Sequence, residues 1–131
     1  MSGAVVEADG LTKIFPMPAG DVTALDGVSV TVKPGDYLSV TGPSGCGKST
    51  LLHLLGCVET PTAGTLRFEG HDVAGMGDRG RSRIRLLRIG FVFQRFFLLP
   101  MLTAWENVEL PMGEARVPKD ERRRRTAELL D

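Results

Sequence analysis

Residues 42–50 read Gly42-Pro43-Ser44-Gly45-Cys46-Gly47-Lys48-Ser49-Thr50. The stretch contains the pattern Gly-x-x-x-x-Gly-Lys-Ser, in which a glycine-rich backbone turns successive N–H groups toward an anion. The Lys48 ammonium supplies a full positive charge for the β- and γ-phosphates, and the Ser49 hydroxyl can ligate Mg²⁺. These residues therefore predict a loop that holds a nucleoside triphosphate together with magnesium.

The residues before this loop have the pattern of a strand, and those after it have the pattern of a helix. Residues 36–41 predict a strand that leads into the loop. Apolar residues at helical spacing then predict a helix that starts near Lys48 and buries one side against a sheet, namely Leu51, Leu52, Leu54 and Leu55. Gly56 ends this helix, and Pro61 prevents its continuation. Strand, loop and helix in this order are the context in which the pattern signals phosphate binding.

The rest of the chain predicts short strands followed by helices. Short strands are expected at 4–6, 22–25, 28–32 and 65–68, and a strand buried on both faces at 89–93. Helices are expected at 79–88, at roughly 119–130, and from the capping box Thr103-Ala104-Trp105-Glu106 onward. The order predicts an α/β chain in which an antiparallel β-subdomain precedes the main sheet.

Composition and charge limit the possible classes of protein. The 131 residues allow one domain, and sixteen Lys and Arg balance sixteen Asp and Glu, which argues against a nucleic-acid partner. The first residues show no secretory leader. The most apolar segment, 96–105, is broken by Pro100 and is shorter than the about 20 residues that a membrane-spanning helix needs. Cys46 and Cys57 follow no metal-ligand spacing and are expected to be reduced.

Three blocks of sequence carry a resemblance to a known family. Residues 22–29, 34–36 and 42–52 resemble the start of the nucleotide-binding domain of ABC transporters. A second match is Pro61-Thr62-Ala63-Gly64, which leads into a strand and the Glu69-Gly70 turn. The third is Ile89-Gly90-Phe91-Val92-Phe93-Gln94 with the following Leu98-Leu99-Pro100 and residues 103–111, and it looks most like the subgroup of lipoprotein release and macrolide export. The blocks occur in family order and cover nearly the whole chain.

The resemblance implies a fold class and a set of site residues. The fold is an α/β P-loop NTPase fold of the ABC ATPase type, with residues 1–35 mainly in the β-subdomain, 36–94 in the P-loop core and 95–131 at the start of the helical subdomain. Phe15 lies where the family places an aromatic ring that stacks on adenine. ATP is expected to contact the whole loop, that is, Gly42, Pro43, Ser44, Gly45, Cys46, Gly47, Lys48, Ser49 and Thr50. Gln94 matches the glutamine that senses Mg²⁺ or the attacking water, so Ser49 and Gln94 are the expected Mg²⁺ ligands.

The resemblance also implies partners and a location. The partners are a transmembrane permease and a second nucleotide-binding subunit, and the protein is expected on the cytoplasmic face of the cell membrane. The family's signature motif, its Asp-Glu pair and its switch histidine have no match after Gln94. We therefore expect this chain to bind MgATP and not to hydrolyse it alone.

Two other functions fit parts of the sequence. Guanylate-kinase-like nucleotide kinases carry a similar Gly-Pro-Ser-Gly-x-Gly-Lys-Ser-Thr loop, although they place it close to the N-terminus, whereas forty-one residues precede Gly42 here. The other alternative is a non-enzymatic segment that docks on a permease through residues 94–102. Nucleotide-dependent capture of a permease without phosphate transfer to a nucleoside monophosphate would separate these functions.

Overall fold

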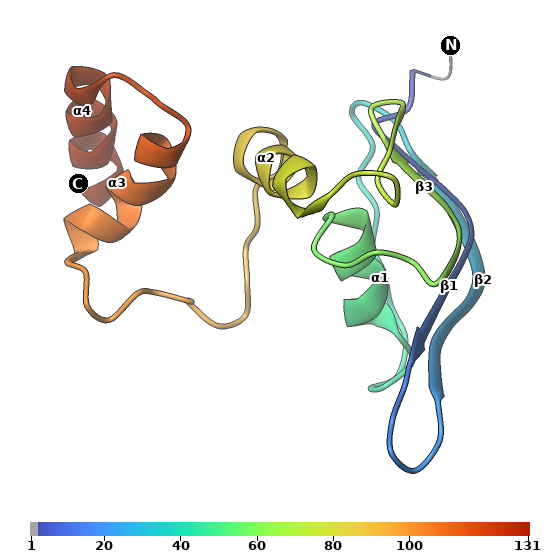
Figure 1. Ribbon diagram of the computed structural model, residues 1–131. Helices are drawn as coiled ribbons and strands as arrows, with labels where there is room; N and C mark the ends of the chain where they lie inside the picture. The colour runs from blue at the N-terminus through green and yellow to red at the C-terminus, as the bar shows by residue number, and fades with distance from the viewer. Residues whose placement is uncertain (1–2) are drawn as a thin grey trace. The chain divides into compact units, whose positions relative to one another are not determined.

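The computed structural model describes residues 3–131, which divide into two compact units (Figure 1). The first unit ends at Arg85 and the second runs from Leu86 to Asp131.

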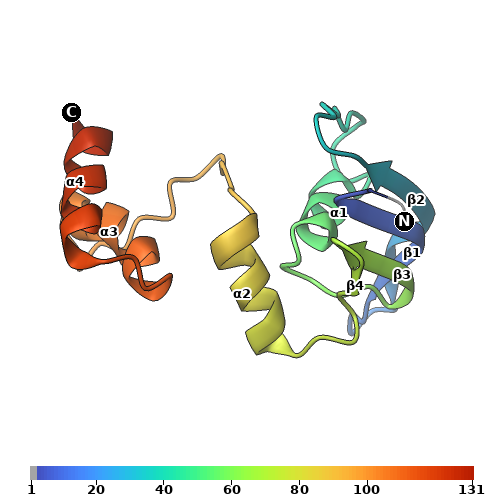
Figure 2. The same ribbon diagram turned by 90° about the horizontal axis from the view of Figure 1, so that it is seen from above.

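The first unit is built on an antiparallel sheet. Its strands within the described residues are β1 (Val6–Phe15), β2 (Val22–Val32), β3 (Ala63–Phe68) and β4 (His71–Asp72), in the order β2-β1-β3-β4. Helix α1 (Lys48–Leu55) lies along one face of this sheet, as both ribbon views show (Figures 1 and 2). The sheet therefore has one face covered by a helix and one face open to solvent, which is a common arrangement for antiparallel sheets.

A β-bulge in β1 decides which side chains face α1. Between Ala8 and Leu11 the strand uses three residues where β2 uses two, and Gly10 supplies the extra residue at a φ of 58°. Strict alternation would put Leu11 on the opposite face from Ala8. Because of the extra residue, both side chains are buried on the helix side of the sheet, with 5% and 0% of their surface exposed. Beyond the bulge the side chains alternate again, so that Lys13 and Phe15 lie on the same face as Leu11, and Thr12 and Ile14 lie on the other.

The core of the first unit fills the space between α1 and the sheet. Its buried apolar side chains are Val6, Ala8, Leu11, Leu25, Leu54, Cys57, Leu66, Phe68 and Val73. Each fully buried leucine stabilises the fold by about 1.5–3 kcal/mol. The leucine stripe predicted for α1 is correct for Leu54 and wrong for Leu52, which is 53% exposed. Leu52 lies about 200° around the helix from Leu54, so the two cannot share one buried face.

Several predicted strands differ from the structure. The segments 22–25 and 28–32 form the single strand β2, and β1 starts at Val6 and continues far beyond the predicted segment 4–6. Neither 36–41 nor 89–93 is a strand, and neither pairs with another strand among residues 3–131. Apolar alternation shows that a segment suits a sheet, but a strand also needs a neighbour whose N–H and C=O groups complete the ladder.

The helices after the sheet match their predictions closely. Helix α2 spans Asp78–Arg88, α3 spans Ala104–Glu114 and α4 spans Lys119–Leu130.

In the second unit α3 and α4 pack on each other, and Arg122 Nε donates to Glu109 Oε1 at 3.1 Å across their contact. Across residues 3–131, no helix is both long and apolar enough to cross a bilayer.

The capping box predicted at the start of α3 is present. Thr103 Oγ1 accepts from the Glu106 backbone N–H at 3.1 Å, and Glu106 Oε2 accepts from the Thr103 backbone N–H at 2.8 Å. The hydrogen bonds from Thr103 lower the pKa of the Glu106 carboxyl. Since the folded pKa is lowered, this contribution to stability is present above the ordinary glutamate pKa and is lost as the pH falls through the lowered value.

Replacing Thr103 with alanine is expected to destabilise α3 by about 1 kcal/mol, because an N-terminal N–H loses its side-chain acceptor. Amide hydrogen exchange along α3 measures this loss. The control is Thr103→Ser, which keeps the hydroxyl and should exchange nearly like the unmodified chain. If amide exchange along α3 is accelerated equally in both variants, the Thr103 hydroxyl does not stabilise the helix.

Candidate functional site

The predicted phosphate loop is held against strand β2 at a point where no side chain fits. Gly47 is the N-terminal cap of α1 and has a φ of 98°, in the left-handed region that glycine adopts without strain. A Cβ atom at this position would lie 2.4 Å from the carbonyl oxygen of Ala24 in β2. The loop can therefore approach β2 this closely because residue 47 is glycine.

The ammonium of Lys48 lies inside the curve of the loop. Its Nζ donates to the carbonyl oxygens of Gly42 and Pro43, each at 2.7 Å, and it lies 3.6 Å from Cys46 Sγ. Cys46 itself is exposed and is a free cysteine. The structure thus places one full positive charge within reach of three other residues of the predicted loop.

The start of α1 adds backbone donors to the same place. The first N–H groups of a helix have no partner within the helix, and at Gly47 no side chain caps them. The first turn of α1 also contains no acidic residue. Ser49 and Thr50 belong to this turn, with Ser49 exposed and Thr50 half-buried. Free N–H groups and the positive end of the helix dipole make this region favourable for an anion.

Loop and sheet together enclose a cavity of about 460 Å³. Its lining residues are Val22, Thr23, Ala24, Ser44, Gly45, Gly47, Lys48, Ser49 and Thr50. The strand side of this wall, residues 22–24, was expected to form a strand but was not among the predicted site residues. The alternation of β2 identifies a strand, but no local signal shows which loop lies beside it.

Five predicted site residues lie outside this lining: Gly42, Pro43 and Cys46 of the loop itself, and Phe15 and Gln94. Phe15 ends β1, is half-buried, and pairs with Val22, which is itself part of the cavity wall. Gln94 belongs to the second compact unit and is exposed in an irregular segment. Within the first unit, the structure therefore brings the residues of the predicted loop together, and it places Phe15 next to the cavity wall through its pairing with Val22.

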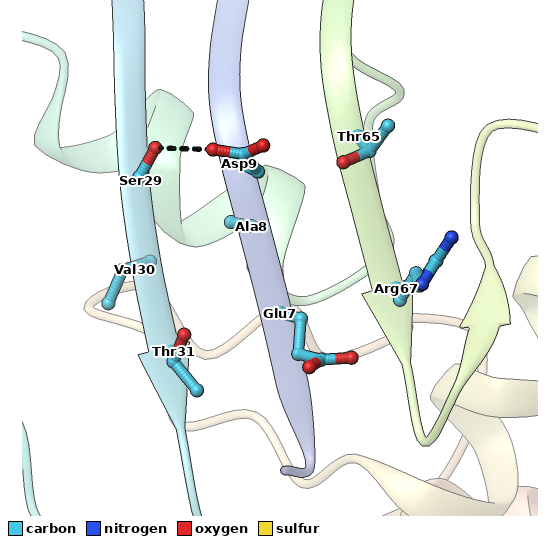
Figure 3. Close-up of a pocket in the computed structure, with 8 residues that line it drawn as sticks. All are labelled: Glu7, Ala8, Asp9, Ser29, Val30, Thr31, Thr65 and Arg67. Atoms are coloured by element: carbon cyan, nitrogen blue, oxygen red, sulfur yellow. Dashed lines mark hydrogen bonds between the residues drawn. The ribbon is translucent and has the colours of Figure 1, made fainter. Parts of the chain in front are cut away.

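A second hollow, of about 590 Å³, lies on the open face of the sheet (Figure 3). It is lined by Glu7, Ala8, Asp9, Ser29, Val30, Thr31, Thr65 and Arg67, which come from β1, β2 and β3. The Ser29 hydroxyl donates to Asp9 Oδ1 at 3.2 Å, drawn as a dashed line in Figure 3. Polar side chains of both charges are what a solvated face of an antiparallel sheet requires.

Cys57 differs from Cys46 in both position and chemistry. It is fully buried behind the C-terminal end of α1, and Arg85 donates to its backbone oxygen at 2.8 Å. Burial raises the pKa of the Cys57 thiol, and the nearby charges of Arg85 and Arg81 partly oppose that rise. A buried thiol of this kind is unreactive and serves as a core residue.

Comparison with known proteins gives a consistent result. The family model described as "ABC transporter" matches residues 25–131. An uncharacterized ABC transporter ATP-binding protein of Thermotoga maritima is 53% identical over 97% of this chain and 54% of its own length. The lipoprotein-releasing system ATP-binding protein LolD 2 of Caulobacter vibrioides is 43% identical over 100% of this chain and 58% of its own length.

A macrolide export ATP-binding/permease protein MacB, from Rhodopseudomonas palustris, is 41% identical over 99% of this chain and 20% of its own length. A solved structure of the dimeric ATP-binding cassette MJ0796, bound to ADP and Pi, superposes with a TM-score of 0.87 at 40% identity, covering 94% of this chain and 54% of that chain. The chain thus spans about half the length of LolD 2, the Thermotoga relative and the solved cassette. The match over residues 25–131 and the identities of 41–53% confirm the resemblance seen in the sequence: the chain belongs to the ABC transporter ATP-binding family, with the α/β fold of its cassettes.

Proposed function

We propose that this chain holds MgATP in the loop 42–50. The observation that carries the proposal is the Lys48 ammonium, which lies 2.7 Å from two loop carbonyls beside the uncapped start of α1. Its two acceptors are neutral oxygens. Phosphate oxygens carry charge and form stronger, charge-assisted hydrogen bonds with an ammonium. A triphosphate in the cavity gives Lys48 better acceptors and also satisfies the free N–H groups of the helix.

The base of the nucleotide is assigned to Phe15. The backbone of this half-buried residue pairs with Val22 of the cavity wall, so the ring lies beside that wall. Aromatic rings stack on a flat base through their faces, and the energy of one such contact is about 0.5–1.5 kcal/mol. The ring therefore adds affinity for a nucleotide over a bare triphosphate.

The residues of the loop also suit magnesium. Mg²⁺ prefers oxygen ligands in an octahedral arrangement and is usually held by few protein groups together with phosphate oxygens and water. The Ser49 hydroxyl is exposed in the first turn of α1, next to Lys48. Among residues 3–131, no three His, Cys, Asp or Glu side chains come together at ligand distance. Ser49 would hold the ion at the loop, and the bound ion would neutralise charge on the phosphates.

The role of the whole protein follows from its family and remains part of the proposal. A solved relative is described as dimeric and bound to ADP and Pi, and MacB is described as an ATP-binding and permease protein. We assign to the complete protein a second nucleotide-binding subunit, a transmembrane permease, a place at the cytoplasmic face of the membrane, and ATP hydrolysis that drives transport. The chain itself is proposed to bind the nucleotide.

The direct test is titration of the full chain with MgATP, followed by calorimetry or by a fluorescent ATP analogue. We expect saturable binding of one nucleotide per chain, and competition by inorganic triphosphate, because the loop recognises phosphates. Absence of binding, or binding that triphosphate does not displace, would refute the assignment to the loop.

Replacing Ser49 with alanine is expected to remove most of the gain in affinity that Mg²⁺ gives to ATP, on the order of tenfold, because the ion loses a protein ligand. Affinity for ATP in EDTA should stay nearly the same. The measurement is a pair of titrations with and without Mg²⁺, and Ser49→Thr is the control because it keeps the hydroxyl. If Ser49→Ala weakens ATP binding equally with and without Mg²⁺, Ser49 belongs to the phosphate site and not to the metal site.

A further inference from the structure

Lys13 is a partly buried cation next to the proposed base-binding ring. Its side chain is 13% exposed, and its Nζ lies 5.2 Å from the centroid of the Phe15 ring. The ammonium also donates to Glu59 Oε2 at 3.0 Å and to the Thr60 carbonyl oxygen at 2.8 Å. A lysine that is withdrawn from water needs such partners. Three interactions therefore fix one ammonium against one aromatic ring.

The partners of Lys13 belong to the loop that follows α1, and this loop is fastened to β1 on both sides of the lysine. The Ile14 N–H donates to Thr62 Oγ1 at 3.0 Å, and the Thr62 N–H donates to the Thr12 carbonyl at 2.8 Å. Residues 59–62 thus hold the end of β1 at consecutive positions. Since α1 begins at the phosphate loop, a short stretch of chain connects the phosphate loop to the support of the ring.

Phe15 depends on contacts to its faces for its orientation. A tyrosine could be held by a hydrogen bond to its hydroxyl, but phenylalanine has no such group. An aromatic ring has two faces, and a cation within about 6 Å of one of them is attracted by the electrons of the ring. Lys13 Nζ lies over one face of Phe15, so only the opposite face can take a flat ligand.

We propose that Lys13 is a positioning residue for the nucleotide base: it holds the ring of Phe15 by one face and so presents the other face for stacking. This inference rests on the proposed function, in which the phosphate loop binds ATP and Phe15 stacks on the base. Lys13 acts through the ring and does not touch the phosphates. Its loss should therefore affect ligands that carry a base and spare those that do not.

The experiment compares two probes on the full chain, MgATP and magnesium tripolyphosphate, which has the phosphates without the base. Lys13→Met should weaken the binding of MgATP about threefold to tenfold, as expected for a disturbed aromatic stack, and leave the affinity for tripolyphosphate unchanged. Lys13→Arg should restore most of the affinity, because arginine also pairs with a carboxylate and packs on a ring. Lys33→Met, at an exposed lysine, is the matched control and should bind both probes normally.

A double-mutant cycle with Phe15→Leu tests whether Lys13 acts through the ring. In the Phe15→Leu background, Lys13→Met should cause no further loss of MgATP affinity. If Lys13→Met does not fold, Glu59→Gln replaces it, since this variant removes one partner of the ammonium and should give a smaller, base-specific loss of about twofold to threefold.

The possible failures are distinguishable. A wild-type chain that binds neither probe refutes the proposed function. A wild-type chain that binds both, with Lys13→Met unchanged for MgATP, refutes the role of Lys13 and leaves the loop in place. The inference is also overturned if Lys13→Met lowers the affinity for MgATP and for tripolyphosphate equally. The same holds if Lys13→Met still causes its full loss of MgATP affinity in the Phe15→Leu background.

Discussion

Replacing Lys48 with alanine is expected to weaken MgATP binding by at least about 100-fold, which corresponds to about 2.7 kcal/mol. The residue supplies the only full positive charge in the lining of the loop cavity within the part of the chain that the structure describes. Each charge-assisted hydrogen bond is worth about 1.5–3 kcal/mol, and the ammonium is placed to give two of them to phosphates. The loss should be as large for tripolyphosphate as for MgATP, since Lys48 is proposed to bind the phosphates and not the base.

The measurement is titration of both ligands at one salt concentration, with thermal unfolding as the test of folding. Lys33→Ala is the control, because Lys33 is exposed near the start of the same connection and does not line the cavity. A Lys48 variant that binds MgATP within a few-fold of the unmodified chain would remove the loop from the proposed function.

Replacing Gly47 with alanine is expected to lower the free energy of unfolding by at least about 2–4 kcal/mol and to abolish nucleotide binding. Two effects add at this position. A residue with a Cβ is strained at a φ of 98°, and the new Cβ would lie 2.4 Å from the carbonyl oxygen of Ala24. Relief of that overlap requires the loop to move away from β2, and the cavity between loop and strand would then lose its shape.

Gly45 offers a matched control in the same loop. Its φ of 81° is also left-handed, but a Cβ at this position would meet no atom within 4 Å. Gly45→Ala should therefore lower the free energy of unfolding only by the backbone strain, about 1–2 kcal/mol. Chemical denaturation of both variants measures the difference. Equal destabilisation would mean that the close approach to Ala24 does not contribute.

The parts of the fold that depend on neighbouring residues were predictable from the sequence. The helix that follows the phosphate loop, the capping box at Thr103 and the helix 119–130 are present as expected. Each is set by a local pattern, such as helical spacing or a hydroxyl three residues before a glutamate. The residues of the phosphate loop likewise gather around Lys48 because they are close in the sequence.

The parts that depend on distant residues were not predictable in the same way. Segments 36–41 and 89–93 are apolar enough for strands, and yet Tyr37 is 95% exposed and Val92 103% exposed, since the described residues offer neither segment a ladder partner. The true length of β1 and the cavity wall at 22–24 are likewise results of pairing between strands. The support of Phe15 by Lys13, Glu59 and Thr60 joins residues more than forty positions apart, and no spacing in the sequence marks it.

The bulge at Gly10 makes some changes of chain length in β1 harmless and others damaging. Because Gly10 is the extra residue, a homologous chain that lacks it would keep Leu11, Lys13 and Phe15 on the helix side, with a regular ladder in place of the bulge. A deletion between Leu11 and Phe15 would instead turn either the core leucine or the ring toward solvent. In an alignment of related chains, single-residue gaps should therefore collect at position 10 and in the hairpin connection 16–21, and be absent from 11–15.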